Sequence, residues 1–181
     1  MSAGISRVAV VGAGLVGASW AVVFVRAGLQ VNLYDADAQQ LPRAAQSVRR
    51  SLEALATAGL LAEPVADVQA RLRQCATLAD ALGDAQYVQE SIVESLAAKQ
   101  ALFAAMDQAA APATILASST SAFVTSSFAE AFAGRGRCIV AHPVNPPHLV
   151  PFVEVSGAEF THDAVVADTM TLMKRVGQSP I

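Results

Sequence analysis

A histidine and a glutamate near the end of the chain have the types and spacing of an acid–base pair. His142 is followed at once by a proline-rich segment, Pro-Val-Asn-Pro-Pro, at 143–147. Glu154 is the only acid in the apolar segment Phe-Val-Glu-Val at 152–155. An isolated charge in a buried strand is costly, so we expect Glu154 to be buried and paired. Imidazole is a natural partner, because the pair fixes its tautomer and raises its basicity. The alternative is a solvated Glu154 on an edge strand, with His142 only packing.

A glycine-rich segment near the N-terminus has the pattern of a dinucleotide phosphate loop. Residues 12–17 read Gly-Ala-Gly-Leu-Val-Gly, directly after a β-branched run. In this GxGxxG pattern the first glycine permits a tight strand-to-helix turn, the second lets a pyrophosphate approach the backbone, and the third lets the helix pack close to the sheet. The two amides before the third glycine would face the phosphates at the positive end of the helix. The predicted loop residues are Gly12, Gly14, Leu15, Val16 and Gly17.

An acid follows the glycines at the distance expected for a ribose contact. Asp35 ends a second apolar run, about 20 residues beyond the glycines, where a carboxylate reaches the adenine ribose hydroxyls. A carboxylate there repels a 2′-phosphate, and no arginine follows immediately to accommodate one. The sequence therefore favours NAD over NADP as the cofactor. The alternative is a simple glycine turn with Asp35 as a solvated strand end.

Short β-branched runs alternate with longer Ala- and Leu-rich ones, which is typical of βαβ units. This pattern predicts one α/β domain over residues 1–181, a doubly wound and mostly parallel sheet that binds a dinucleotide. The predicted strands are 7–11, 30–34, 76–77, 85–88, 114–117, 138–141 and 152–155. The predicted helices are 15–27, 42–58, 63–73, 96–109 and 163–176.

Composition and spacing exclude several other classes of protein. The formal net charge of −3 does not suggest a nucleic-acid-binding surface. The two cysteines make no disulfide framework, and a reducing, cytoplasmic setting fits them best. The spacing of His142, His148 and His162 matches no common zinc pattern, so we expect no metal. Eighteen uncharged residues at 8–25 could be read as a membrane span. The glycines within that run and the lack of a basic cluster before it argue against this interpretation.

Together these motifs resemble the L-3-hydroxyacyl-CoA dehydrogenase superfamily. The resemblance rests on the glycine loop, on Ser-Ser-Thr-Ser at 118–121, on Ala-His-Pro-Val-Asn-Pro-Pro at 141–147 and on Glu154. The segment Cys-Ile-Val-Ala-His-Pro-Val-Asn-Pro-Pro and the closing Gly-Gln-Ser-Pro at 177–180 are most similar to the lambda-crystallin/L-gulonate 3-dehydrogenase branch. The resemblance runs from about Val8 to the end of the chain.

The resemblance implies an NAD-dependent dehydrogenase that acts on a small-molecule 3-hydroxy acid or 3-hydroxyacyl thioester. In the implied reaction the catalytic base takes the hydroxyl proton while the carbon-bound hydrogen is transferred as a hydride to the nicotinamide. The resemblance also implies a homodimer, formed mainly through a C-terminal helical domain that is absent from this chain. The implied roles are the base for His142, its orienting carboxylate for Glu154, a contact with the substrate oxygen and nicotinamide ribose for Ser121, and NAD contacts for Asn145, Glu94 and Lys99.

Two departures from the acyl-CoA enzymes bear on the substrate. Ser119 stands where those enzymes usually carry asparagine, and the predicted helix 42–58 has arginines but no lysine for CoA. These departures favour a polyhydroxy acid over a 3-hydroxyacyl-CoA of fatty-acid metabolism, which stays open as an alternative. A second alternative is a non-catalytic NAD-binding or structural protein. The retained His142, Ser121 and Glu154 argue against it, because cofactor binding alone needs none of them.

Overall fold

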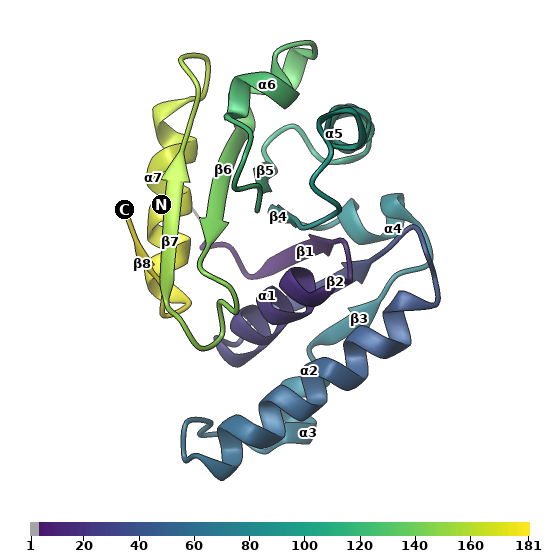
Figure 1. Ribbon diagram of the computed structural model, residues 1–181, viewed down its shortest axis with the longest axis vertical. Helices are drawn as coiled ribbons and strands as arrows, with labels where there is room; N and C mark the ends of the chain where they lie inside the picture. Colours follow the sequence, from purple (N-terminus) through teal and green to yellow (C-terminus); the bar gives the residue numbers. More distant parts are fainter. Residues whose placement is uncertain (1–3) are drawn as a thin grey trace.

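A sheet of eight strands runs through the molecule (Figure 1). The structure is a computed structural model that describes residues 4–181, so the first three residues of the predicted domain lie outside the described residues. The strand order is β3-β2-β1-β4-β5-β6-β7-β8, and among the described strands only the β6–β7 pair is antiparallel. The prediction of a doubly wound, mostly parallel α/β sheet is confirmed. The strands are β1 Arg7–Val11, β2 Gln30–Tyr34, β3 Leu72–Gln74, β4 Tyr87–Glu90, β5 Ile115–Ser118, β6 Cys138–Pro143, β7 Phe152–Ser156 and β8 Ser179–Pro180.

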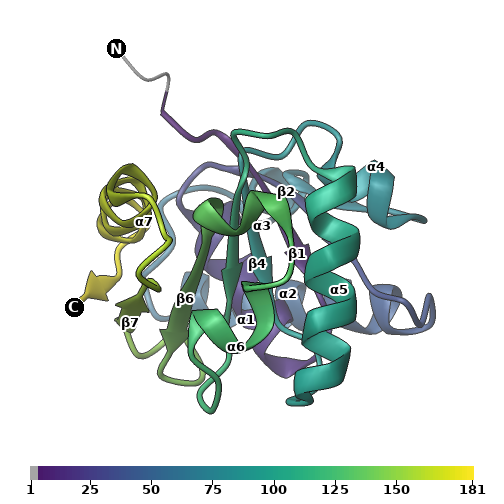
Figure 2. The ribbon, with the colours of Figure 1, turned by 90° about the horizontal axis from the view of Figure 1, so that it is seen from above.

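Helices cover both faces of this sheet and enclose two apolar cores. One core lies between the sheet and helices α1, α2 and α7, and the other lies between the sheet and α4, α5 and α6. Figure 2 shows α5 and α6 in front of the strands, with α1 and α2 behind them. The helices are α1 Leu15–Arg26, α2 Gln40–Thr57, α3 Val65–Gln69, α4 Leu78–Leu82, α5 Leu96–Ala109, α6 Thr125–Ala129, α7 Asp163–Arg175 and the 3₁₀ helix Ala133–Arg137.

The uncharged run at 8–25 is divided between a buried strand and a buried helix. Strand β1 lies in the middle of the sheet, and every residue of α1 from Gly17 to Val25 is buried. Trp20 and Phe24 of α1 stack at 5.3 Å between ring centroids, and Phe24 meets Tyr87 of β4 edge to face. Within residues 4–181, none of the helices combines the length and the apolar character needed to cross a membrane.

The sheet positions the candidate site through its strand order. The order reverses between β1 and β4, because the chain builds outward to β3 on one side and to β8 on the other. In open α/β sheets, ligands bind beyond the carboxyl ends of the strands at such a reversal. The glycine-rich segment follows β1 directly, Ser91 follows β4, Ser119 follows β5, and His142 lies at the end of β6. The residues with candidate chemistry therefore meet at one edge of the sheet.

One region of the sequence was interpreted wrongly, and it forms the edge beyond β2. Of the predicted helix 63–73 only Val65–Gln69 is helical, and Leu72–Gln74 instead forms the edge strand β3 beside β2. The predicted strand at 76–77 is wrong, because the Thr77 side chain accepts a hydrogen bond from the Asp80 N–H and caps α4. Helices α4 and α6 were not predicted. Strand β4 extends to Glu90, two residues beyond the predicted end.

Candidate active site

The glycine-rich segment forms the turn that the pattern predicts. Gly12 has a φ of +101°, which favours glycine, and a Cβ at this position would lie 2.6 Å from the backbone of Ser91. A Cβ at Gly17 would lie 1.8 Å from the carbonyl oxygen of Gly12, so α1 packs directly on the turn. A Cβ at Gly14 would meet nothing within 4 Å. The turn is therefore closed on the protein side at Gly12 and Gly17 and open on the outer side at Gly14.

The start of α1 presents free backbone donors beside this open position. The first intrahelical hydrogen bond runs from the Ala18 N–H to the Gly14 carbonyl. The N–H groups of Leu15 and Val16 precede that bond, so they have no acceptor within the helix. Asp35 follows β2 and accepts a hydrogen bond of 2.7 Å from the Ala13 N–H. The predicted acid is thus held against the predicted phosphate loop.

A cleft of about 310 Å³ continues from the start of α1 across the ends of β4, β5 and β6. Of the residues predicted for the site, Val16, Glu94, Lys99, Ser121, His142 and Asn145 line it. Its other lining residues are Ser91, Ile92, Ser119 and Pro143. The structure therefore brings the predicted residues from four separate segments of the chain into one cleft, next to the glycine turn.

The predicted acid–base pair is present, but it is not buried. His142 Nδ1 lies 2.8 Å from Glu154 Oε2, across the antiparallel pair of β6 and β7, where the two residues are in register. The expectation that Glu154 is buried is wrong, because its side chain is 57% exposed. Val153 is buried on the face of β7 that α7 covers, whereas Glu154 points to the other face. The His142 side chain is 29% exposed and lines the cleft.

A buried ion pair lies beneath the cleft and ties β4 to α5. Lys99 Nζ lies 2.9 Å from Glu90 Oε1 and 3.3 Å from Glu94 Oε2, and the side chains of Lys99 and Glu90 are almost wholly buried. Glu94 also accepts hydrogen bonds from the Thr120 hydroxyl and from the Ser121 and Ala122 N–H groups. Burial opposes ionisation of Glu94, but these hydrogen bonds and the Lys99 charge outweigh it and lower its pKa. Glu94 is thus an ionised carboxylate that holds the loop after β5.

The sequence did not predict a role for several polar residues at this edge. Gln89 and Glu90 are fully buried at the end of β4, and Ser91 follows them into the cleft. The predicted strand stopped at Val88, so the two residues fell in a supposed loop. The available signal was the pair of polar residues Gln89 and Glu90 directly after an apolar run. If the strand continues through them, their side chains are buried and require hydrogen-bond partners nearby.

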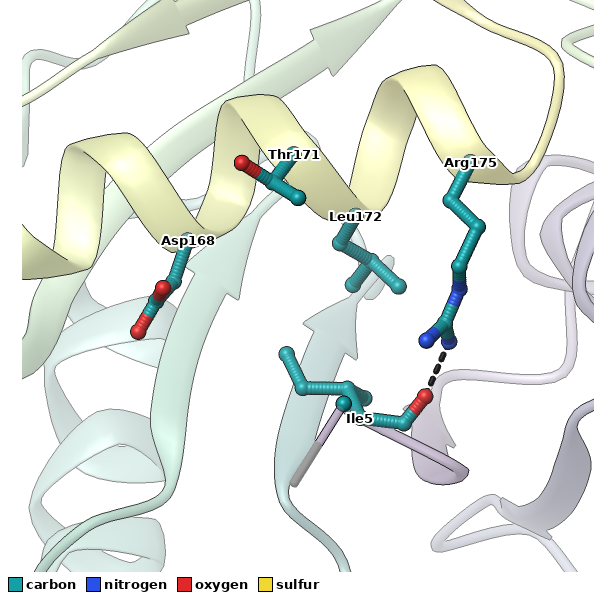
Figure 3. A pocket seen from close by; sticks show the side chains of 6 residues that line it. Ile5, Asp168, Thr171, Leu172 and Arg175 are labelled. Carbon is teal, nitrogen blue, oxygen red and sulfur yellow. Dashed lines mark hydrogen bonds between the residues drawn. The ribbon is translucent and has the colours of Figure 1, made fainter. Parts of the chain in front are cut away.

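Other hollows lie away from this edge. A hollow of about 160 Å³ lies between α7 and the segment before β1, lined by Ile5, Asp168, Thr171, Leu172 and Arg175 among others (Figure 3). Arg175 closes one side by donating to the Ile5 carbonyl (Figure 3). This hollow is at the amino end of β1, opposite the glycine turn, and it is remote from His142. Among residues 4–181, no group of three or more His, Cys, Asp or Glu side chains could hold a metal ion.

The residues present fit a bound dinucleotide. The open position at Gly14, the free N–H groups at the start of α1 and the carboxylate of Asp35 match the pyrophosphate and the adenosine ribose of such a ligand. The cleft continues from the helix start to His142, in the direction that the second nucleoside would take.

Comparisons with known proteins agree with this geometry. Residues 7–181 match the model of the family "3-hydroxyacyl-CoA dehydrogenase, NAD binding domain". A lambda-crystallin homolog from Bos taurus is 43% identical over 176 residues, which cover 96% of this chain and 55% of the relative. An L-carnitine dehydrogenase from Streptomyces coelicolor is 37% identical over 177 residues, which cover 98% of this chain and 55% of the relative. The chain therefore spans about half the length of these relatives.

Solved structures give the same result. The crystal structure of 3-hydroxybutyryl-CoA dehydrogenase from Escherichia coli superposes with a TM-score of 0.93 at 32% sequence identity. The match covers 98% of this chain and 38% of that one. Motifs, strand order, site geometry and these similarities agree on one conclusion: the chain belongs to the 3-hydroxyacyl-CoA dehydrogenase family, as a Rossmann-type NAD-binding domain.

Proposed function

We propose that this chain is the NAD-binding half of a dehydrogenase that oxidises the 3-hydroxyl of a small hydroxy acid, similar to L-gulonate 3-dehydrogenase. The observation that carries the proposal is the hydrogen bond of 2.8 Å between His142 and Glu154, at the end of a cleft that begins at the glycine turn. Binding of NAD alone needs the turn and Asp35. A base with its own carboxylate is needed only if a proton is moved.

The pair determines which nitrogen of His142 is the base. Glu154 is bonded to Nδ1, so a neutral His142 carries its proton there and leaves the lone pair of Nε2 free. Nε2 takes the proton of the substrate hydroxyl, and Glu154 stabilises the imidazolium that forms. General acid–base catalysis of this kind typically contributes about 10²–10⁴-fold. NAD, when bound, would supply the acceptor for the hydride, so that the hydrogen on carbon leaves with its electron pair as the C=O bond forms.

Two further residues of the cleft complete the proposed substrate and nicotinamide contacts. Ser121 lines the cleft with an exposed side chain, and we assign its hydroxyl to the substrate oxygen and the nicotinamide ribose. Asn145 follows the end of β6, and we assign its amide to the nicotinamide. Both residues come from loops that begin at the strand ends, so the sheet sets their positions relative to His142.

Glu94 and Lys99, which both line the cleft, act on the cofactor as a pair. The three donors of the Lys99 ammonium are matched by two oxygens of Glu90 and one of Glu94. Lys99 therefore keeps Glu94 ionised and in place, and the Glu94 carboxylate accepts a hydrogen bond from a ribose hydroxyl. This assignment makes Lys99 mainly a positioning residue rather than a direct contact.

The chain supports a hydroxy acid with a free carboxylate more strongly than a CoA thioester. Ser119 replaces the asparagine of acyl-CoA enzymes, and α2 offers Arg43, Arg49 and Arg50 but no lysine. The similarity to lambda-crystallin homologs and to L-carnitine dehydrogenases points the same way. The second candidate is a 3-hydroxyacyl-CoA dehydrogenase of fatty-acid metabolism, favoured by the similarity to the Escherichia coli structure. A third is a non-catalytic NAD-binding or structural protein.

The proposal extends to a second domain and to an assembly. We propose that a helical domain covers the cleft at the carboxyl ends of the strands and forms most of a homodimer interface. We further propose that the enzyme acts on a small molecule in the cytoplasm. The relatives are nearly twice as long as the matched part, which supports such a domain.

An assay of three substrates tests the proposed function. A chain that continues through a second domain is assayed with NAD and L-gulonate, L-carnitine or L-3-hydroxybutyryl-CoA. We expect the highest kcat/KM with one of the two free acids. A higher value with the CoA thioester would establish the second candidate, and no turnover with any substrate, despite tight NADH binding, would favour the third.

A further inference from the structure

A chain of hydrogen-bonded side chains runs from the buried Gln89 of β4 through Ser119 to Ser91 at the cleft. The amide of Gln89 can have only one orientation, because its nitrogen lies 3.1 Å from the carbonyl oxygen of Ala141, an obligate acceptor. Its oxygen accepts a hydrogen bond of 2.8 Å from the Tyr87 hydroxyl. Burial raises the pKa of Tyr87 well above its ordinary value, so this hydroxyl remains a donor.

The orientation of Gln89 fixes the hydroxyl of Ser119. The second N–H of the Gln89 amide donates to Ser119 Oγ at 2.7 Å, and the indole N–H of Trp20 donates to the same oxygen at 3.1 Å. A hydroxyl oxygen has two lone pairs and one hydrogen. Both lone pairs of Ser119 are therefore occupied by groups that can only donate, and Ser119 must itself donate its hydrogen.

The hydrogen of Ser119 determines the state of Ser91. Ser91 Oγ lies 2.9 Å from Ser119 Oγ, and a hydrogen bond in this pair could in principle run in either direction. Because Ser119 has no free lone pair, Ser119 donates and Ser91 accepts. The hydrogen of Ser91 then has no acceptor among the described residues, and Ser91 lines the cleft. The buried side chains thus turn Ser91 into a donor toward the ligand.

The position of Ser91 identifies the part of the ligand that it meets. Its backbone touches Gly12 of the phosphate turn on one side. On the other side lie Ser119 after β5 and His142 at the end of β6. The pyrophosphate belongs over the start of α1, and the reacting ring belongs beside His142. The sugar that joins them passes over the end of β4, where Ser91 and Glu94 follow the strand.

We propose that Ser91 donates a hydrogen bond to an oxygen of the nicotinamide-side ribose, and that Gln89 and Ser119 are positioning residues that hold it in this donor state. The inference rests on the proposed NAD site. It also gives Ser119 a role in the cofactor site, because its single hydroxyl accepts the N–H groups of Gln89 and Trp20 and donates to Ser91. Because Gln89 is bonded to the Ala141 carbonyl, the same network joins the cofactor site to the residue before His142.

Binding of cofactor fragments to the 181-residue chain tests the proposal. NADH, ADP-ribose and ADP are titrated by calorimetry against the unmodified chain, Ser91→Ala, Ser119→Ala, the double variant and the control Ser126→Ala on α6. ADP-ribose retains the second ribose, and ADP lacks it. Melting temperatures show that each variant is folded.

We expect Ser91→Ala to weaken the binding of NADH and of ADP-ribose by the same factor, about two- to tenfold for the loss of one neutral hydrogen bond. The affinity for ADP should not change. The double variant should bind no more weakly than Ser91→Ala, because Ser119 acts through Ser91. The assignment to the ribose would be overturned if Ser91→Ala weakened the binding of ADP as much as that of ADP-ribose. It would also be overturned if the variant weakened the binding of NADH alone, or changed the affinity for none of the ligands. If the unmodified chain itself bound no NADH, the proposed function would fail as well.

Discussion

At the scale of single residues, the exposure of Glu154 determines how strongly it assists His142. A carboxylate that is 57% exposed is screened by water, so its charge contributes less than in a buried pair. Its geometric effect is independent of screening, because the hydrogen bond to Nδ1 orients the ring and leaves Nε2 free as a base. Orientation is therefore the larger part of what Glu154 contributes.

The first prediction concerns this pair. In a catalytically complete enzyme, His142→Gln should lower kcat by about 10²–10⁴-fold, since it removes the base. Glu154→Gln should lower kcat less, by about tenfold, because glutamine still accepts a hydrogen bond from Nδ1 and only the screened charge is lost. Steady-state kinetics measure both effects, and the dissociation constant for NADH serves as the control and should stay within about twofold of the unmodified value. A larger loss from Glu154→Gln than from His142→Gln would contradict these roles.

The residues of the site differ in how far the sequence could predict them. The pairing of His142 with Glu154 followed from one acid in an apolar segment, but its exposure did not, because that depends on which face α7 covers. Glu90 and Gln89 were missed because their burial depends on the true end of β4. The partners of Lys99 come from β4 and from the turn after it, so their meeting could not be deduced from spacing along α5.

At the level of secondary-structure elements, the turn between β1 and α1 contains one glycine that the fold requires, Gly17, and one that the ligand requires, Gly14. A side chain at Gly17 would collide with the backbone of Gly12, whereas one at Gly14 would stand in open space. The same pattern of three glycines therefore serves two purposes: close packing of the helix on the turn and access for a ligand.

The second prediction uses that difference. Gly17→Ala should destabilise the fold by roughly 2 kcal/mol or more, because the added methyl group overlaps backbone atoms that cannot move freely. Gly14→Ala should change the free energy of unfolding by less than about 1 kcal/mol and yet weaken NADH binding by about tenfold or more, since the methyl group occupies the path of the pyrophosphate. Urea unfolding and NADH titration of both variants measure these effects. Unimpaired NADH binding by Gly14→Ala would show that the ligand does not lie over this turn.

The third prediction concerns the tie between β4 and α5. Lys99→Met leaves the carboxylate of Glu90 buried without its counter-ion, although the Ile92 N–H and the Ser118 hydroxyl still donate to it, and this loss should cost about 3–5 kcal/mol of stability. The double variant Lys99→Met, Glu90→Gln removes both charges and should recover a large part of that loss. Urea unfolding measures both, with the exposed pair Arg49–Glu53 of α2 as a control whose disruption by Arg49→Met should cost less than about 1 kcal/mol. A loss of less than about 1 kcal/mol for Lys99→Met would mean that Glu90 is not a buried charge.

Central elements could be predicted from the sequence, and edge elements could not. Strand β1 and helix α1 carry long apolar runs and a turn motif, so their bounds were predicted to within one residue. Strand β3 has three residues, of which Arg73 and Gln74 are exposed, and neither an apolar run nor alternation marks it. It forms because the edge of β2 offers backbone partners at Val31, Asn32 and Leu33, which is tertiary information.

At the scale of the whole molecule, apolar side chains stand exposed around the carboxyl edge of the sheet. Leu15, Val93, Val124 and Val144 are 40–70% exposed, and they follow β1, β4, β5 and β6 respectively. Each of them lies within three residues of one that lines the cleft. Exposed apolar groups that border a site favour contact with another surface, here the proposed second domain.

The fourth prediction follows from these exposed apolar side chains. The 181-residue chain should bind NADH but turn over L-gulonate, L-carnitine and L-3-hydroxybutyryl-CoA far more slowly than a chain that continues through a second domain. It should also self-associate as its concentration rises, and Val93→Ser with Val124→Ser should reduce that association. Steady-state assays and sedimentation equilibrium measure these properties. Comparable turnover by the shorter chain would refute the placement of the substrate between two domains.

One calorimetric titration of the chain with NADH and NADPH measures whether the glycine turn, Asp35 and the cleft at the strand ends bind NAD. We expect one saturable NADH site per chain and an affinity for NADPH that is at least about tenfold lower, because Asp35 repels the 2′-phosphate. Asp35→Asn, which keeps an oxygen acceptor for the Ala13 N–H but loses the charge, should narrow that difference. Equal affinities of the unmodified chain for NADH and NADPH would show that Asp35 does not select NAD, and no saturable binding of NADH would show that the cleft is not an NAD site.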